Sequence, residues 1–189
     1  MPRVPVPQRR RGFTFVELAV VMTILLVALL IFSSTVSGMA KQRTVNRETG
    51  LAVEAARNRL EMLRSEDFAQ VYALYNSDPD DDPGGAGTAP GARFAVDGLD
   101  PEPDSVDGLV GEVVFPTFLD PVAGLQLRED VEIPTLGMPR DLTSDNVIDD
   151  QDHSNSYFIL PVLIRLRWNG PSGVRVYEMP TQLCRVLRT

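Results

Sequence analysis

The apolar residues of this chain are concentrated in one continuous block near the N-terminus. Residues 13–32 read FTFVELAVVMTILLVALLIF, in which Glu17 is the charged side chain. Twenty residues at a helical rise of about 1.5 Å each span about 30 Å, which is the thickness of a bilayer's hydrocarbon core. Arginines precede the block, and basic flanks keep that end of a membrane helix in the cytoplasm. The pattern predicts a membrane helix over 13–32 with the remainder of the chain exported.

After residue 32 the sequence turns polar but stays compatible with a helix. Charged side chains, among them Glu48 and Arg59, are expected on the solvent-facing side. Apolar residues recur at intervals of three, four and seven, which places them on one helix face. These residues are Val45, Ala52, Ala56, Leu60 and Leu63. We therefore expect an amphipathic helix continuing over 33–75, with Ser65 as the cap of a short last helix.

The C-terminal half has a different pattern. Residues 76–108 are rich in Asp, Pro and Gly, which predicts a long acidic surface loop. Beyond residue 108 the apolar residues recur every second position, as they do in strands. Strands are predicted over 112–115, 125–131, 158–168 and 174–179, with a turn at 169–173.

The order of these elements predicts the fold class. A long helix followed by an antiparallel sheet indicates an α+β fold, in which the sheet head occupies 109–189. The face of the last hairpin that bears Trp168 is expected to pack on the apolar stripe of the helix. The alternate face, which includes Leu163, is expected to meet water.

The net charge, the one cysteine and the one histidine narrow the classes of function that the chain could have. The formal net charge is −8, and several of the arginines lie before residue 13, so the exported part is strongly acidic. Such a body repels phosphate backbones, which argues against nucleic-acid binding. One cysteine, Cys184, excludes an intrachain disulfide and is expected to be a small buried apolar residue. The one histidine, His153, is expected in solvent. No nucleophile or phosphate-loop motif appears, so an enzyme is not expected.

Two ordinary interpretations of the apolar block leave observations unexplained. A secretory signal peptide cleaved near Gly38 and Ala40 has an apolar region of about 7–15 residues, which is shorter than this block. A plain single-pass anchor accounts for the length but not for Glu17. A carboxylate in a membrane helix costs about 2.5–3.5 kcal/mol and usually has a functional reason.

The segment Gly12-Phe13-Thr14-Phe15-Val16-Glu17 after a basic leader resembles the processing site of type IV prepilins and of type II secretion pseudopilins. The resemblance implies that a prepilin peptidase removes the leader 1–12 by cutting after Gly12 and methylates the new terminus, Phe13. Glu17 is then the fifth mature residue. In a dry filament core its carboxylate needs a cation, which the α-amino group of a neighbouring subunit's Phe13 would provide.

The same resemblance implies partners and a location. The chain would sit in the inner membrane with its N-terminus cytoplasmic and its head periplasmic, and would then enter a pilus or pseudopilus filament. Its partners would be the prepilin peptidase, other pilin or pseudopilin subunits, the inner-membrane assembly machinery and the membrane. The acidic, elaborated head favours a minor subunit, and the last hairpin loosely resembles that of minor pilins.

Residues 141–152 are a candidate calcium loop. Calcium takes six to eight oxygens, and a twelve-residue loop supplies them from positions 1, 3, 5, 7, 9 and 12. Asn146 at position 6 tolerates the left-handed backbone needed there, and Ile148 at position 8 is expected to face inward. The segment resembles the loops of EF-hands and dockerins, although no amphipathic helix flanks it. The expected ligands are Asp141, Thr143, Asp145, the Val147 carbonyl, Asp149 and Asp152.

Three alternatives remain open at this stage. The loop could be an acidic linker whose aspartates are turn formers. The chain could be a membrane-tethered, calcium-dependent binding module that never polymerises. A hydrolase using paired carboxylates has little support, because those aspartates lie in polar surroundings where a raised pKa is not expected.

Overall fold

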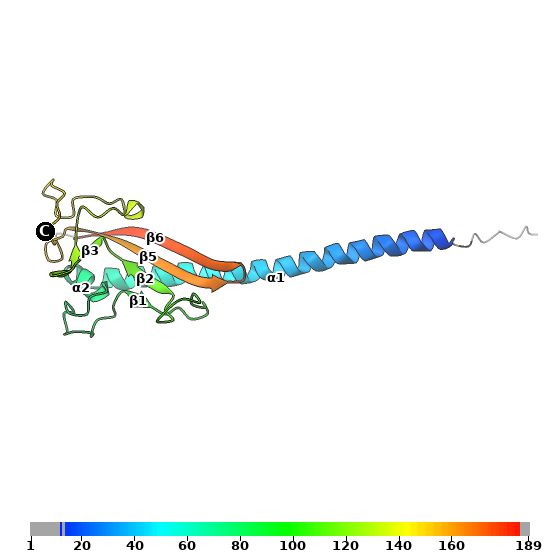
Figure 1. Cartoon of the computed structure of the whole chain (residues 1–189), viewed down its shortest axis with the longest axis horizontal. Coiled ribbons are helices and arrows are strands. Elements are labelled where there is room, and N and C mark those ends of the chain that lie inside the picture. The colour runs from blue at the N-terminus through cyan, green and yellow to red at the C-terminus, as the bar shows by residue number, and fades with distance from the viewer. Residues whose placement is uncertain (1–11, 13, 186–189) are drawn as a thin grey trace, which may run out of the picture. The chain divides into compact units, whose positions relative to one another are not determined.

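The computed structural model describes residues 12 and 14–185, and it confirms the predicted α+β fold of a long helix followed by an antiparallel sheet (Figure 1). The chain divides into two compact units, Met1–Thr44 and Val45–Thr189, and the helix α1 contributes to both. The elements are α1 (Phe15–Ser65), η1 (Phe68–Gln70), α2 (Val71–Tyr75), β1 (Arg93–Phe94), β2 (Gly111–Val114), β3 (Thr117–Asp120), β4 (Gly124–Leu127), η2 (Pro134–Leu136), β5 (Ile159–Gly170) and β6 (Gly173–Cys184).

Within the described residues, the first unit is mostly the apolar part of α1. Its large side chains, from Phe15 to Phe32, are exposed in the isolated chain. Among the described residues, α1 is the one helix long and apolar enough to cross a membrane. Residues 15–32 of the predicted membrane helix lie in this part. Thr14 precedes the helix, and Phe13 is outside the described residues.

The helical region ends differently from the prediction. Helix α1 stops at Ser65, whose hydroxyl donates to the Met62 carbonyl within the same helix instead of capping a new one. Asp67 caps the next element, because its carboxylate accepts a hydrogen bond from the Ala69 N–H. The short helix predicted to end at Tyr75 is therefore η1 followed by α2.

Four strands form one antiparallel sheet in the order β1-β2-β5-β6. The predicted hairpin is present but longer, since β5 and β6 each contain twelve residues and pair along their whole length. The predicted strand over 125–131 is shorter, because β4 ends at Leu127. Its partner β3 was not predicted, and the two form a separate small hairpin.

One part of the core lies between α1 and one face of this sheet. Figure 1 shows β5 and β6 beside the cyan, C-terminal part of α1. Ala52, Ala56 and Leu63 are buried in one cluster with Trp168, as the apolar stripe predicts. Two charged side chains that were predicted to face solvent instead contact the rest of the head. Glu48 accepts a hydrogen bond from the Trp168 indole, and Arg59 is buried.

The alternate face of β5 is not open to water along its first half, contrary to the prediction. Leu163 is fully buried, and Leu136, Met138 and Leu142 of the segment between β4 and β5 belong to the same core cluster. The η2 turn of that segment contacts both β5 and β6. Only the second half of this face is polar, where Arg165 pairs with Glu178 at 2.8 Å.

Cys184 also departs from expectation. It ends β6 and is exposed, whereas a small buried residue was predicted. The alternation along β6 explains the difference, because Leu183 faces the core and its neighbour Cys184 must face the other way.

Candidate metal centre and processing site

The predicted processing site lies at the start of α1. Gly12 is described and exposed, whereas the predicted methylation site Phe13 lies outside the described residues. Thr14 and Glu17 hydrogen bond reciprocally: the Glu17 N–H donates to the Thr14 hydroxyl at 3.3 Å, and the Thr14 N–H donates to the Glu17 carboxylate at 3.4 Å. This is a capping box, which satisfies two N–H groups that a helix start leaves free. Glu17 is exposed and is available to a partner.

The predicted calcium loop has the expected turn at its centre. Asn146 has a φ of 67°, which is the left-handed conformation predicted for position 6. Asp141, at position 1, accepts a hydrogen bond from the Asn146 N–H at 2.8 Å. Together with donors from Thr143 and Ser144, this bond lowers the pKa of Asp141 and outweighs the opposing effect of desolvation.

Two of the other predicted ligands bind backbone donors. Asp145 accepts from the Val147 N–H, and Asp152 accepts from the Leu127 N–H at 3.1 Å, so each carboxylate serves a backbone donor. Ile148 is 51% exposed, although position 8 was predicted to face inward. Aspartates used in this way are typical turn formers.

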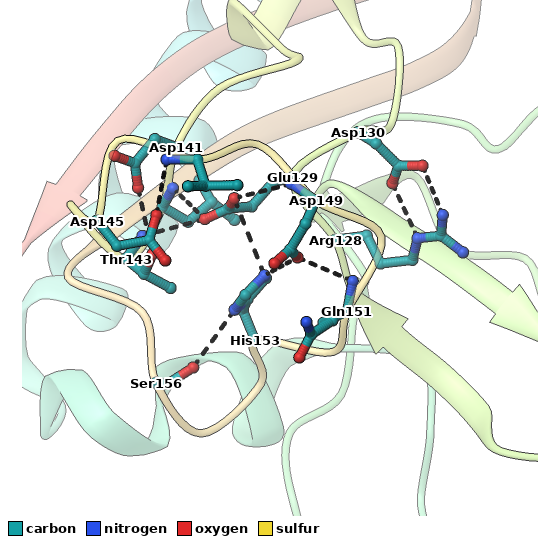
Figure 2. Close-up of polar contacts among 12 residues, drawn as sticks. Arg128, Glu129, Asp130, Asp141, Thr143, Asp145, Asp149, Gln151, His153 and Ser156 are labelled. Carbon is teal, nitrogen blue, oxygen red and sulfur yellow. Dashed lines mark hydrogen bonds and ion pairs between the residues drawn. The ribbon is translucent and has the colours of Figure 1, made fainter.

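The structure instead brings one loop residue together with two residues outside the predicted ligand set. Among the described residues, Glu129, Asp149 and His153 are the group whose ligand atoms all lie within 4.8 Å of one another, so they could hold a metal ion (Figure 2). The Nε2 atom of His153 lies 2.9 Å from Asp149 Oδ1 and 3.9 Å from Glu129 Oε2.

Backbone pairing positions this group. Glu129 lies two residues after β4, and its carbonyl accepts from the Arg140 N–H at 3.1 Å. The His153 N–H donates to the Leu127 carbonyl at 2.8 Å. The segment therefore returns to the end of β4 twice, which brings both ends of the predicted loop beside Glu129.

Glu129 is buried, with 1% of its surface exposed. One carboxylate oxygen accepts from the Leu142 N–H at 2.6 Å and the Thr143 N–H at 3.1 Å. The other oxygen accepts a longer bond from the Asp149 N–H and faces His153. The sequence did not point to Glu129, because this residue lies between other charged residues and belongs to no recognisable motif.

His153 is buried, which corrects its predicted place in solvent. Its ring is oriented from both sides, because Nε2 faces the carboxylates and Nδ1 lies 3.5 Å from the Ser156 hydroxyl. The Gln151 N–H and the His153 ring both hold the pKa of Asp149 below its usual value. Asp149 is thus kept ionised, as a metal ligand must be.

Comparison with known proteins bears on the N-terminal segment. A family model described as the prokaryotic N-terminal methylation motif matches residues 7–33. No curated protein and no solved structure matches the chain. The matched segment contains Gly12, Glu17 and the whole apolar block, and proteins that carry this motif are structural subunits. The match supports a type IV pilin-like or pseudopilin precursor.

Proposed function

We propose that this chain is a minor subunit of a type IV pilus or of a type II secretion pseudopilus, cleaved after Gly12 and methylated at Phe13. The observation that carries the proposal is the methylation motif over 7–33 at the start of a long helix that leads into an antiparallel sheet head. Its role is structural, and no catalytic step is assigned to it.

The proposed location rests on the helix and its flanks. The apolar part of α1 anchors the precursor in the inner membrane, with the arginine-rich leader cytoplasmic and the head periplasmic. The prepilin peptidase acts first. The assembly machinery then transfers the subunit from the membrane into a filament of pilin or pseudopilin subunits.

Glu17 is the proposed assembly contact. In the isolated chain its carboxylate is exposed and bonds weakly to Thr14, so it retains capacity for a further partner. In a filament core it would pair with the α-amino group of a neighbouring subunit's Phe13. Removing one member of such a desolvated pair leaves a buried charge, which strongly disfavours assembly.

The intact mass of the protein, isolated from cells with and without the prepilin peptidase, tests the proposal. We expect a chain that begins at methylated Phe13 only when the peptidase is present. Gly12→Leu is the matched control and should keep its leader, because it removes the glycine before the proposed cut. A Cβ at this position meets no other described group within 4 Å, so the change should not disturb the fold. A chain that begins at Met1 or at Lys41 in both strains would overturn the proposal, and would indicate a plain anchor or a secreted protein.

The competing function is a membrane-tethered binding module that does not polymerise. It is favoured if the processed chain is never recovered in filaments. The calcium loop over 141–152 stays a prediction: the turn at Asn146 supports it, and the outward-facing Ile148 does not. A rise in melting temperature at millimolar calcium that Asp141→Asn abolishes would support it.

A further inference from the structure

We propose that Glu129, Asp149 and His153 bind a divalent transition-metal ion of the zinc class, and that this ion fastens the segment between β4 and β5 onto the sheet. The inference goes beyond the subunit role and does not depend on it. It concerns the fold of the head alone, so either proposal can fail while the other stands.

The distances suit a small ion. Zinc bonds to histidine nitrogen and carboxylate oxygen are about 2.0–2.2 Å, so two ligands at a tetrahedral angle lie about 3.3–3.6 Å apart. The separations from His153 Nε2 to the two carboxylates are 2.9 and 3.9 Å, which lie on either side of that range. Shifts of a few tenths of an ångström would close the site, and water would complete the coordination.

The burial and charge of the group point to a cation. Glu129 is 1% exposed and His153 is 7% exposed, so both are largely removed from solvent. Among the described residues, the one cationic partner recorded for Glu129 is His153, at 3.9 Å and only when protonated. A buried carboxylate needs a compensating charge. A divalent ion would balance Glu129 and Asp149 together while the imidazole stays neutral.

The donor set selects the class of ion. Calcium and magnesium bind through oxygen atoms, and a histidine nitrogen in the first shell disfavours both. Zinc and its neighbours accept imidazole together with carboxylates. The Ser156 hydroxyl near His153 Nδ1 is placed as an outer partner that would orient the ring and leave Nε2 for the metal.

The location of the group gives the ion a structural role. Glu129 precedes the long segment that covers the alternate face of β5, and Asp149 lies 20 residues further along. An ion held by both would close this loop and reduce the conformational freedom of the unfolded chain. With a single cysteine in the sequence, no intrachain disulfide can do this.

The first test uses the single histidine as a probe. Full-length protein is prepared in detergent without a histidine tag and with Cys184→Ser, because the exposed thiol could itself bind zinc. Selective 15N labelling of histidine then gives the ring nitrogens of His153 alone. We expect Nε2 to shift to the position of a metal-bound nitrogen at one equivalent of zinc, and not to do so at millimolar calcium. No shift with zinc, or the same shift with calcium, would overturn the proposal.

The second test measures zinc affinity by competition with a chromophoric chelator. Glu129→Gln and His153→Gln keep hydrogen-bonding groups but remove a ligand, and each should weaken binding at least about tenfold. Asp145→Asn is the matched control on the same segment and should bind as the parent does. Equal affinity in all three variants would assign the zinc to another site and refute the proposal. If a variant fails to fold, the histidine signal of the parent still decides the question.

Discussion

The indole N–H of Trp168 donates a hydrogen bond to the Glu48 carboxylate at 3.1 Å, which joins β5 to α1 across 120 positions of sequence. Trp168 is among the largest fully buried side chains, and a buried indole N–H needs a partner. Glu48 is therefore a structural residue of the helix–sheet contact, although its charge suggested solvent.

Removing this acceptor should destabilise the head. Glu48→Ala leaves the indole N–H unpaired and should lower the free energy of unfolding by about 1–3 kcal/mol. Glu48→Gln keeps an acceptor and should cost less. Urea unfolding followed by the fluorescence of the single tryptophan measures both, with exposed Glu54→Ala as the control. Equal losses for Glu48→Ala and Glu54→Ala would contradict the assigned role.

The charge and the capping role of Glu17 can be separated. Glu17→Gln keeps an acceptor for the Thr14 N–H but removes the charge, whereas Thr14→Ala removes the cap and keeps the charge. If the charge drives assembly, Glu17→Gln should be cleaved normally yet absent from sheared filaments. Thr14→Ala should enter filaments at an almost normal level. The reverse outcome would show that helix capping, and not charge pairing, is what assembly needs.

Arg59 should act mainly through packing. Its guanidinium lies 4.8 Å from the Tyr75 ring centroid and 4.6 Å from that of Phe94, and it donates to the Gly91 carbonyl. Burial lowers its pKa, which shows that the charged form is desolvated. Arg59→Ala should cost about 2–3 kcal/mol, whereas Arg59→Met should cost about 1 kcal/mol by keeping the stem and the ring contacts. Equal losses in urea unfolding would show that the charge matters more.

Stability should fall in strong base because of buried tyrosines. Burial raises the pKa of Tyr157 to about 12, and its hydroxyl donates to the Phe68 carbonyl at 2.7 Å. Between pH 10 and 12 the unfolded chain loses this proton while the folded chain keeps it. The free energy of unfolding should therefore drop by about 1.4 kcal/mol per pH unit for this group.

Tyr157→Phe tests that assignment. It should be less stable than the parent at pH 8, because it lacks the hydrogen bond. Above pH 10 its stability should fall less steeply, and the two curves should converge. Urea unfolding at a series of pH values measures both slopes, and parallel curves across the whole range would exclude Tyr157 as a source of the alkaline loss.

Local patterns predicted much of this fold. A long helix was expected because the stretch to Ser65 contains no proline and its apolar residues follow a helical period. The β5–β6 hairpin was expected because its alternation and turn are both local. The short strand β3 was missed, since its exposed Phe118 and Leu119 do not alternate with polar residues.

By itself the sequence determined the methylation motif, the apolar helix and the α+β order, because each depends on neighbouring residues. Only the tertiary structure decided which faces of the sheet are covered and which distant side chains meet. Leu163 is buried under the segment between β4 and β5, and no repeating pattern of apolar residues predicts the path of that segment. Glu129 reaches Asp149 and His153 only because that segment pairs twice with the end of β4. Contacts between distant residues depend on the packing of the whole chain, and no local pattern specifies them.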